Sequence, residues 1–257
     1  MPTGAITGYI DVAQVVLYVF WAFFAGLIYY LLREGKREGY PLVSDRAKHI
    51  RVEGWPPMPK PKTYLLPHGG TVSAPSPSTD TRSIAAAPFA NFPGAALQPT
   101  GDPMRDAVGP ASYALREDKP EMTLEGQPMI VPMRVMPEAA VAAEDPDPRG
   151  MAVIGCDGKR GGTVQELWVD RAEPQIRYLE VAVAGSRGKP VLVPMTLARV
   201  RGERRVVEVS SVTSAQFAGA PKLKNPDQVT KLEEDKITAY FASGHLYATP
   251  DRLGPLL

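Results

Sequence analysis

The side chains best suited to moving protons gather in one stretch of the sequence. This stretch mixes carboxylates with arginines: Glu166, Asp170, Arg171, Glu173 and Arg177. A carboxylate raises the proton affinity of another carboxylate nearby and a guanidinium lowers it, so a buried set can take up and release protons near neutral pH. A solvated protein surface has a similar composition, and the spacing is compatible with both interpretations.

No other pattern in the sequence indicates catalysis or metal binding. The three histidines, His49, His68 and His245, are isolated from one another, and with the single Cys156 they form no metal-ligand spacing. A nucleophile motif of the Gly-x-Ser-x-Gly type is also missing. We therefore predict a chain that is not an enzyme, has no metal site and holds no redox cofactor by itself.

An uncharged apolar run covers residues 12–32, with Gln14 as its one strongly polar side chain. A helix of this length reaches about 31 Å, close to the thickness of the hydrocarbon core of a bilayer, so the run predicts a transmembrane helix. Ala22 and Gly26 are four residues apart and share a helix face, where small side chains let another helix approach closely. The usual small-residue content of membrane helices explains this spacing equally well.

Charge on the two sides of this run predicts its orientation. Asp11 is the one charged residue before it, whereas basic residues dominate after it. Basic flanks favour the cytoplasmic side, so we expect a periplasmic N-terminus over residues 1–11 and a cytoplasmic chain from residue 33. Basic and aromatic side chains at this boundary also predict a lipid-headgroup site formed by Tyr30, Arg33, Lys36, Arg37 and Lys62.

The cytoplasmic chain has two parts of different character. Residues 33–133 are punctuated by proline and show no sustained helical or strand period, as in 55–62, 73–81 and 92–103. Such a segment is either disordered or ordered on the surface of a partner, and both interpretations stay open. Residues 134–257 contain short apolar runs separated by turns, at 151–156, 163–170, 176–184 and, more briefly, between 189 and 211.

These short runs predict an antiparallel sheet closed into a small barrel. In residues 176–184, Leu179 and Val181 should lie on one face and Tyr178 and Glu180 on the other. Asn225 and the proline after it predict a helix over residues 227–243 that ends at Gly244. The fold class is thus a membrane-anchored mixed α/β chain, mainly β, with one N-terminal transmembrane helix, an extended surface segment, a barrel and a C-terminal helix.

Several longer blocks of sequence point to a known family. They are REGYPL (37–42), PKPKTYLLPHGGT (59–71), PTGDPM (99–104), VGPASY (108–113), LWVDRAEPQIRYLEV (167–181) and LEEDKITAY (232–240). In order and extent, these blocks resemble the H subunit of purple-bacterial photosynthetic reaction centres. The resemblance implies a PRC-type β-barrel in the cytoplasmic domain and a location in the intracytoplasmic membrane of a photosynthetic bacterium.

The resemblance also implies partners. The family's H subunit caps the L and M subunits, which bind bacteriochlorophyll, bacteriopheophytin, quinones and a non-haem iron, with carotenoid also in the complex. An antenna ring, a cytochrome subunit and membrane lipids are further candidate partners, and nucleic acid is not. The implied function is to stabilise L and M, to shield the quinone sites and to conduct protons to the secondary quinone.

The resemblance assigns proton transfer to particular residues. The family's acids in the turn after Trp-Val-Asp fall on Asp170 and Glu173, and its arginine falls on Arg177. At the proton entrance, where well-known members have an Asp and two His, this chain has Thr123, Glu125 and Gln127. Either Glu125 replaces them, with the nearby acids Asp118 or Glu121, or protons enter elsewhere. A membrane-anchored PRC-barrel adaptor without a photosynthetic role is the alternative function.

Overall fold

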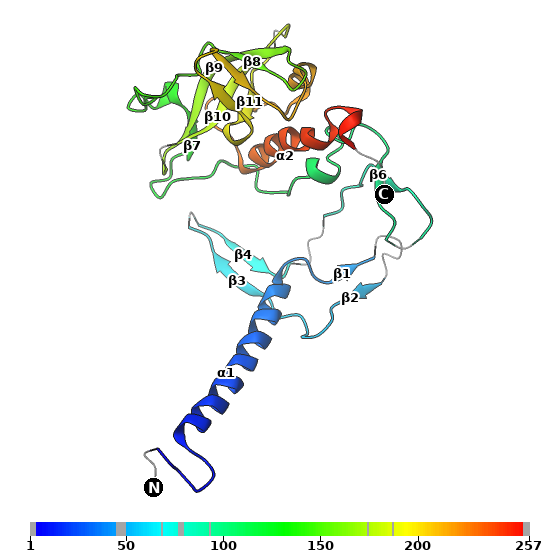
Figure 1. Ribbon diagram of the computed structural model, residues 1–257, viewed down its shortest axis with the longest axis vertical. Coiled ribbons are helices and arrows are strands. Elements are labelled where there is room, and N and C mark those ends of the chain that lie inside the picture. The colour runs from blue at the N-terminus through cyan, green and yellow to red at the C-terminus, as the bar shows by residue number, and fades with distance from the viewer. Residues whose placement is uncertain are drawn as a thin grey trace. The chain divides into compact units, whose positions relative to one another are not determined.

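The computed structural model describes residues 4–44, 50–67, 69–76, 80–92, 94–173, 175–186 and 188–253. His49 and His68 lie outside these ranges. The chain divides into two compact units, residues 1–80 and 81–257. Figure 1 shows the apolar helix in the first unit and the sheet with its helix in the second.

The first unit is built on the expected apolar helix, α1 (Val12–Glu34). Asp11 caps its N-terminus, because the Asp11 carboxylate accepts a hydrogen bond from the Gln14 backbone N–H at 2.7 Å. None of its residues is buried. The helix is long and apolar enough to cross a membrane, which is consistent with a single-pass membrane anchor.

Short hairpins follow α1 where the sequence shows no sustained period. After the 3-10 turn η1 (Gly35–Arg37), the antiparallel pairs are β1 (Leu42–Val43) with β2 (Arg51–Val52), β3 (Lys62–Leu65) with β4 (Thr71–Ala74), and, in the second unit, β5 (Ala86–Pro88) with β6 (Leu97–Pro99). Nearly all residues of these strands are exposed. A two-stranded hairpin with so little buried surface is marginally stable alone, so the segment depends on other contacts.

The second unit contains a seven-stranded sheet. Its strands are β7 (Ile130–Pro132), β8 (Ala152–Ile154), β9 (Arg160–Asp170), β10 (Ile176–Val183), β11 (Val191–Pro194), β12 (Arg199–Arg201) and β13 (Val206–Glu208). The order is β11-β10-β9-β8-β13-β12, and β7 pairs with the end of β9. The sheet is not wholly antiparallel as expected, because β8 and β13 pair in parallel, which the long connection through β9 to β12 makes possible.

Two features of the sheet depart from the expected pattern. The turn expected over 157–162 is shorter in the structure, because β9 already begins at Arg160. Gly161 is therefore a strand residue and not a turn residue. Glycine is needed there because a Cβ on residue 161 would lie 2.5 Å from the Phe217 ring. Both faces of β10 are buried, so Tyr178 and Glu180 are buried as well as Leu179. The C-terminal helix covers this second face at Tyr178, whose hydroxyl donates to Glu234, and the segment before the helix covers it at Glu180.

That helix, α2 (Lys231–Tyr247), begins later than expected. Asn225 does not cap it; the Asn225 side chain accepts a hydrogen bond from the Asp227 N–H within a separate turn. Thr230 is the cap, in a reciprocal capping box with Glu233 that satisfies two otherwise free N–H groups. Gly244 lies inside the helix instead of ending it, because a Cβ there would collide with the Ser211 backbone carbonyl.

A single apolar core joins these elements. It includes Leu167, Trp168, Leu179, Ile237 and Phe241, all essentially inaccessible to solvent. Short 3-10 turns complete the unit: η2 (Gly109–Ala111), η3 (Met133–Val135), η4 (Met195–Leu197), η5 (Ser214–Gly219) and η6 (Pro250–Leu253). The core includes side chains of both β9 and β10, and it thereby positions the end of β9 at Asp170.

Candidate proton-transfer site

The structure brings two separate acidic segments together at the end of β9. Pairing of Ile130 in β7 with Asp170 in β9 places the turn over 122–128 beside the turn over 170–173. The Arg171 guanidinium donates to the Gln127 side-chain oxygen at 2.7 Å, and the Arg171 N–H donates to the Met129 carbonyl at 2.9 Å. The Asp170 turn and the Glu125 segment therefore form one site.

The two acids of the β9–β10 turn occupy different environments. Asp170 is buried, and its carboxylate accepts backbone N–H groups from Ala172 at 2.9 Å and Glu173 at 3.2 Å. Glu173 is exposed, and its carboxylate accepts a hydrogen bond from the Gln175 amide at 3.2 Å. Asp170 thus shapes the turn, and Glu173 is the carboxylate that the turn presents outward.

An open hollow of about 520 Å³ lies between the two turns. Glu125, Gln127, Glu138 and Arg171 supply its polar lining. Glu125 is exposed, and its own backbone N–H and the Thr123 hydroxyl lower the pKa of its carboxyl by donating to it. The carboxylate form of Glu125 is therefore favoured near neutral pH.

Asp118 lies apart from this hollow. Its carboxylate pairs with the Lys224 ammonium and accepts the Thr230 hydroxyl at 2.9 Å. These two donors lower the pKa of Asp118, with the Lys224 hydrogen bond as the larger cause. Asp118 thereby fastens the segment before α2 and remains ionised.

Arg177 and Glu121 lie near a carboxylate that the sequence analysis did not select, Glu234 in the first turn of α2. Burial raises the pKa of Glu234, the negative charge of Glu121 raises it further, and the Tyr178 hydrogen bond and Arg177 lower it. The Tyr178 hydroxyl donates to the Glu234 carboxylate at 2.9 Å. Because acids are common in the first turn of any helix, only the packing of α2 on β10 distinguishes Glu234.

The residues of the predicted lipid-headgroup site, at and after the end of α1, do not all line the same hollow. Tyr30, Arg33, Arg37 and Lys62 line one hollow of about 360 Å³. Glu34 lies among them and pairs with Arg37 at 2.8 Å and Lys62 at 2.7 Å. The Arg33 Nε is buried without a hydrogen-bond partner.

Lys36 is separate from this hollow. Its side chain is buried, and its ammonium donates to the backbone carbonyls of Glu53 and Pro56. The ammonium also lies 5.1 Å from the centre of the Tyr40 ring. Lys36 therefore holds the loop over 53–56 to the end of α1.

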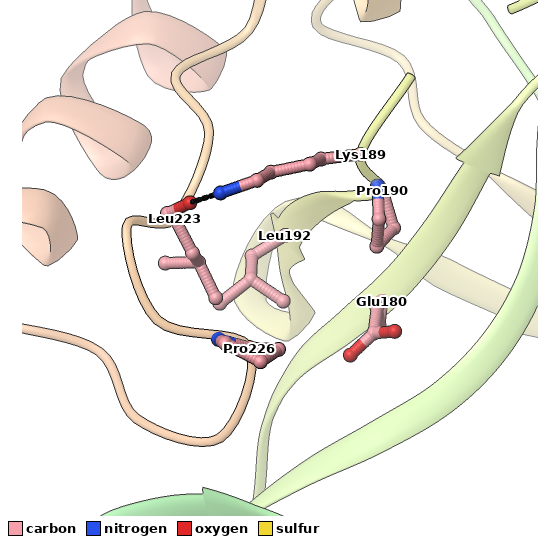
Figure 2. A pocket seen from close by; sticks show the side chains of 6 residues that line it. All are labelled: Glu180, Lys189, Pro190, Leu192, Leu223 and Pro226. Carbon is pink, nitrogen blue, oxygen red and sulfur yellow. Dashed lines mark hydrogen bonds between the residues drawn. The ribbon is translucent and has the colours of Figure 1, made fainter. Parts of the chain in front are cut away.

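A smaller, mostly apolar cavity of about 130 Å³ lies under the segment that leads to α2 (Figure 2). Lys189 closes one side by donating to the Leu223 carbonyl at 3.2 Å. Glu180 lies on another side, and its carboxylate is already held by the Trp168 indole at 2.8 Å and by Arg134 at 3.1 Å. These contacts give Glu180 a structural role.

Among the residues that the structure describes, nothing packs on the α1 face that carries Ala22 and Gly26: Ala22 is exposed, and a Cβ on Gly26 would meet nothing within 4 Å. Over the described part of the chain, no three His, Cys, Asp or Glu side chains come close enough to hold a metal ion. The polar side chains that line the hollow between the two turns carry carboxylate, hydroxyl, amide and guanidinium groups.

Comparison with known families accounts for this combination of helix, extended segment and β-rich domain. Residues 4–135 match the family described as the photosynthetic reaction centre H-chain, N-terminal region. Residues 141–216 match the PRC-barrel domain. The first match covers more than half of the chain, and the second covers most of the sheet. The chain therefore belongs to the photosynthetic reaction centre H-chain family, as a non-catalytic subunit with a PRC-barrel domain.

Proposed function

We propose that this chain caps the L and M subunits of a reaction centre on the cytoplasmic side, shields their quinone sites and conducts protons to the secondary quinone. The observation that carries the proton role is the junction of the Glu125 segment with the Asp170–Glu173 turn. A proton that enters the hollow can be accepted by Glu125 on one side of Arg171 and by the carboxylates of the Asp170–Glu173 turn on the other. The pigments, quinones, iron and carotenoid belong to the partner subunits in this proposal.

In the proposed path, the exposed Glu125 collects protons from the cytoplasm in place of the histidines of other members. Because its pKa is lowered, Glu125 holds a proton only briefly and releases it readily to the next group. Glu173 is the exit of the path, because the Asp170 hydrogen bonds hold the turn that carries it. Arg177, Glu121 and Glu234 form a flanking group that sets the local charge.

The capping role is tested by isolating the chain gently from its membrane with an affinity tag. We expect near-infrared bacteriochlorophyll absorption to co-purify with it, because pigments on L and M remain with a bound cap. A purified assembly without pigment would favour the membrane-anchored adaptor instead. The proposed orientation predicts that protease added to right-side-out vesicles leaves the residues after α1 intact.

We also propose that Tyr30, Arg33, Arg37 and Lys62 bind an anionic lipid headgroup. The unpartnered Arg33 Nε supports this, because a buried N–H without an acceptor is rare and a phosphate oxygen would satisfy it. Neutralising Arg33 and Lys62 together should remove bound anionic lipid from the complex in native mass spectrometry. Retention of the lipid would contradict the site.

A further inference from the structure

Trp55 is strongly exposed although it belongs to an ordered loop. Its side chain is 74% exposed, yet its ring packs on the ring of Tyr29, with the ring centres 5.5 Å apart. Tyr29 is exposed too, so the two rings form one contiguous patch, and a contiguous exposed apolar patch marks a surface that something else covers. The question is which surface covers it.

The position of Tyr29 in α1 fixes the depth of Trp55 relative to a membrane. Tyr29 lies three residues before Leu32, the last residue of the apolar run, so it lies about 4.5 Å inside the end of that run. Since the two rings are in contact, Trp55 lies near the same level. If α1 spans the bilayer, Trp55 is therefore at the boundary between hydrocarbon and headgroups.

The loop is held in this place by the chain itself. Lys36, in the 3-10 turn η1 after α1, donates to the carbonyls of Glu53 and Pro56 on both sides of Trp55. Between Glu53 and Lys60 the loop has no charged residue. An uncharged loop with one exposed indole can approach the membrane without moving a charge out of water.

The surroundings suit a lipid surface. Trp and Tyr are enriched where a membrane meets water, because their rings are apolar and their N–H or O–H groups find polar partners. Tyr29 and Tyr30 are exposed beside the loop, and the basic residues Arg33 and Lys60 line the hollow next to them. Basic side chains at this level attract anionic headgroups.

We propose that Trp55 is an interfacial membrane anchor, which fastens the loop over 53–59 to the lipid surface beside the end of α1. The indole ring lies at the hydrocarbon boundary, and its N–H donates to a lipid carbonyl or phosphate oxygen. The proposal depends on α1 crossing the membrane and is independent of proton transfer. The chain thus contacts the bilayer through two segments that are far apart in sequence.

Quenching by brominated lipid measures the depth of Trp55. The full chain, which has three tryptophans, is placed in phosphatidylcholine vesicles brominated near the headgroup or deep in the acyl chains. The fluorescence emission of wild type minus that of Trp55→Phe gives the emission of Trp55. The emission of wild type minus that of Trp21→Phe gives the emission of Trp21, which lies inside α1. Shallow bromine should quench Trp55 more and deep bromine should quench Trp21 more, while Trp168 in the core serves as the unquenched reference.

Equal Trp55 emission with and without bromine would overturn the proposal, provided that Trp21 is quenched. A second experiment on the intact complex in its membrane excludes a protein cover. The photoreactive p-benzoylphenylalanine at position 55, with Phe23 as control, should yield adducts with lipid. Cross-links from position 55 to another polypeptide, or lipid adducts at position 23 alone, would also overturn it. The pigment spectrum of the complex, which tests the capping role, does not depend on either result.

Discussion

Single carboxylates in this chain have roles that follow from their neighbours and not from their type. Asp170 and Glu173 are three residues apart, yet one is buried under two backbone N–H groups and the other is exposed. The sequence predicts that both lie in one turn. It does not predict which is buried, because this depends on the pairing of β7 with β9. For the same reason it does not single out Glu234, whose environment is made by Tyr178 of a distant strand.

The partly buried position of Glu234 predicts a specific dependence of stability on pH. Its folded-state pKa is raised by burial, so the folded chain binds this proton more tightly than the unfolded chain, where the pKa is about 4.3. Stability is therefore lost as the pH rises from that value through the higher folded-state pKa. Glu234→Gln removes this loss. The free energy of unfolding of the variant minus that of wild type should therefore increase as the pH rises between the two pKa values, and should stay constant at higher pH.

Denaturant unfolding of the detergent-solubilised chain, followed by near-ultraviolet circular dichroism at several pH values, measures this difference. Glu203→Gln, in the exposed turn between β12 and β13, is the matched control and should show no such trend. A difference between Glu234→Gln and wild type that stays constant with pH would contradict the assignment.

At the scale of elements, the apolar pattern predicted what lies along the chain better than where each element ends. The apolar composition of residues 12–32 is enough to predict the helix α1, and the alternation of residues 176–184 is enough to predict the strand β10. The predicted start of α2 was wrong, because the sequence contains two good helix starts, Asn225-Pro226 and Thr230-x-x-Glu233. Tertiary contacts select the second: the Pro226 carbonyl binds Arg134, and Glu233 also accepts the Lys224 N–H at 2.8 Å.

This choice predicts the effect of removing the cap of α2. Thr230→Ala removes the acceptor for the Glu233 N–H and the donor to Asp118, so it should lower the free energy of unfolding by about 1–2 kcal/mol. Thr230→Ser keeps the hydroxyl and should stay within about 0.5 kcal/mol of wild type. Thermal or denaturant unfolding checks both. An equal loss in the two variants would mean that the methyl group, and not the cap, stabilises this position.

At the scale of the whole molecule, the apolar helix and the carboxylates of the proposed proton path lie in different units of the chain. Residues 1–80 contain the apolar helix and the basic and aromatic side chains near its end, whereas residues 81–257 contain the sheet and the clustered carboxylates. The sequence predicted this order. It did not predict the role of Lys36, because a buried lysine that donates to two backbone carbonyls cannot be distinguished in sequence from its exposed basic neighbours.

The second electron transfer to the secondary quinone tests the central claim most directly, because that step requires a proton. In flash experiments on the purified complex, Glu173→Gln should slow this transfer and the accompanying proton uptake by up to about a hundredfold, without changing primary charge separation. Glu125→Gln should slow proton uptake if it is the entrance, and Glu203→Gln should match wild type. Wild-type rates in Glu173→Gln across roughly pH 6 to 9 would contradict the account and leave the chain as a scaffold alone.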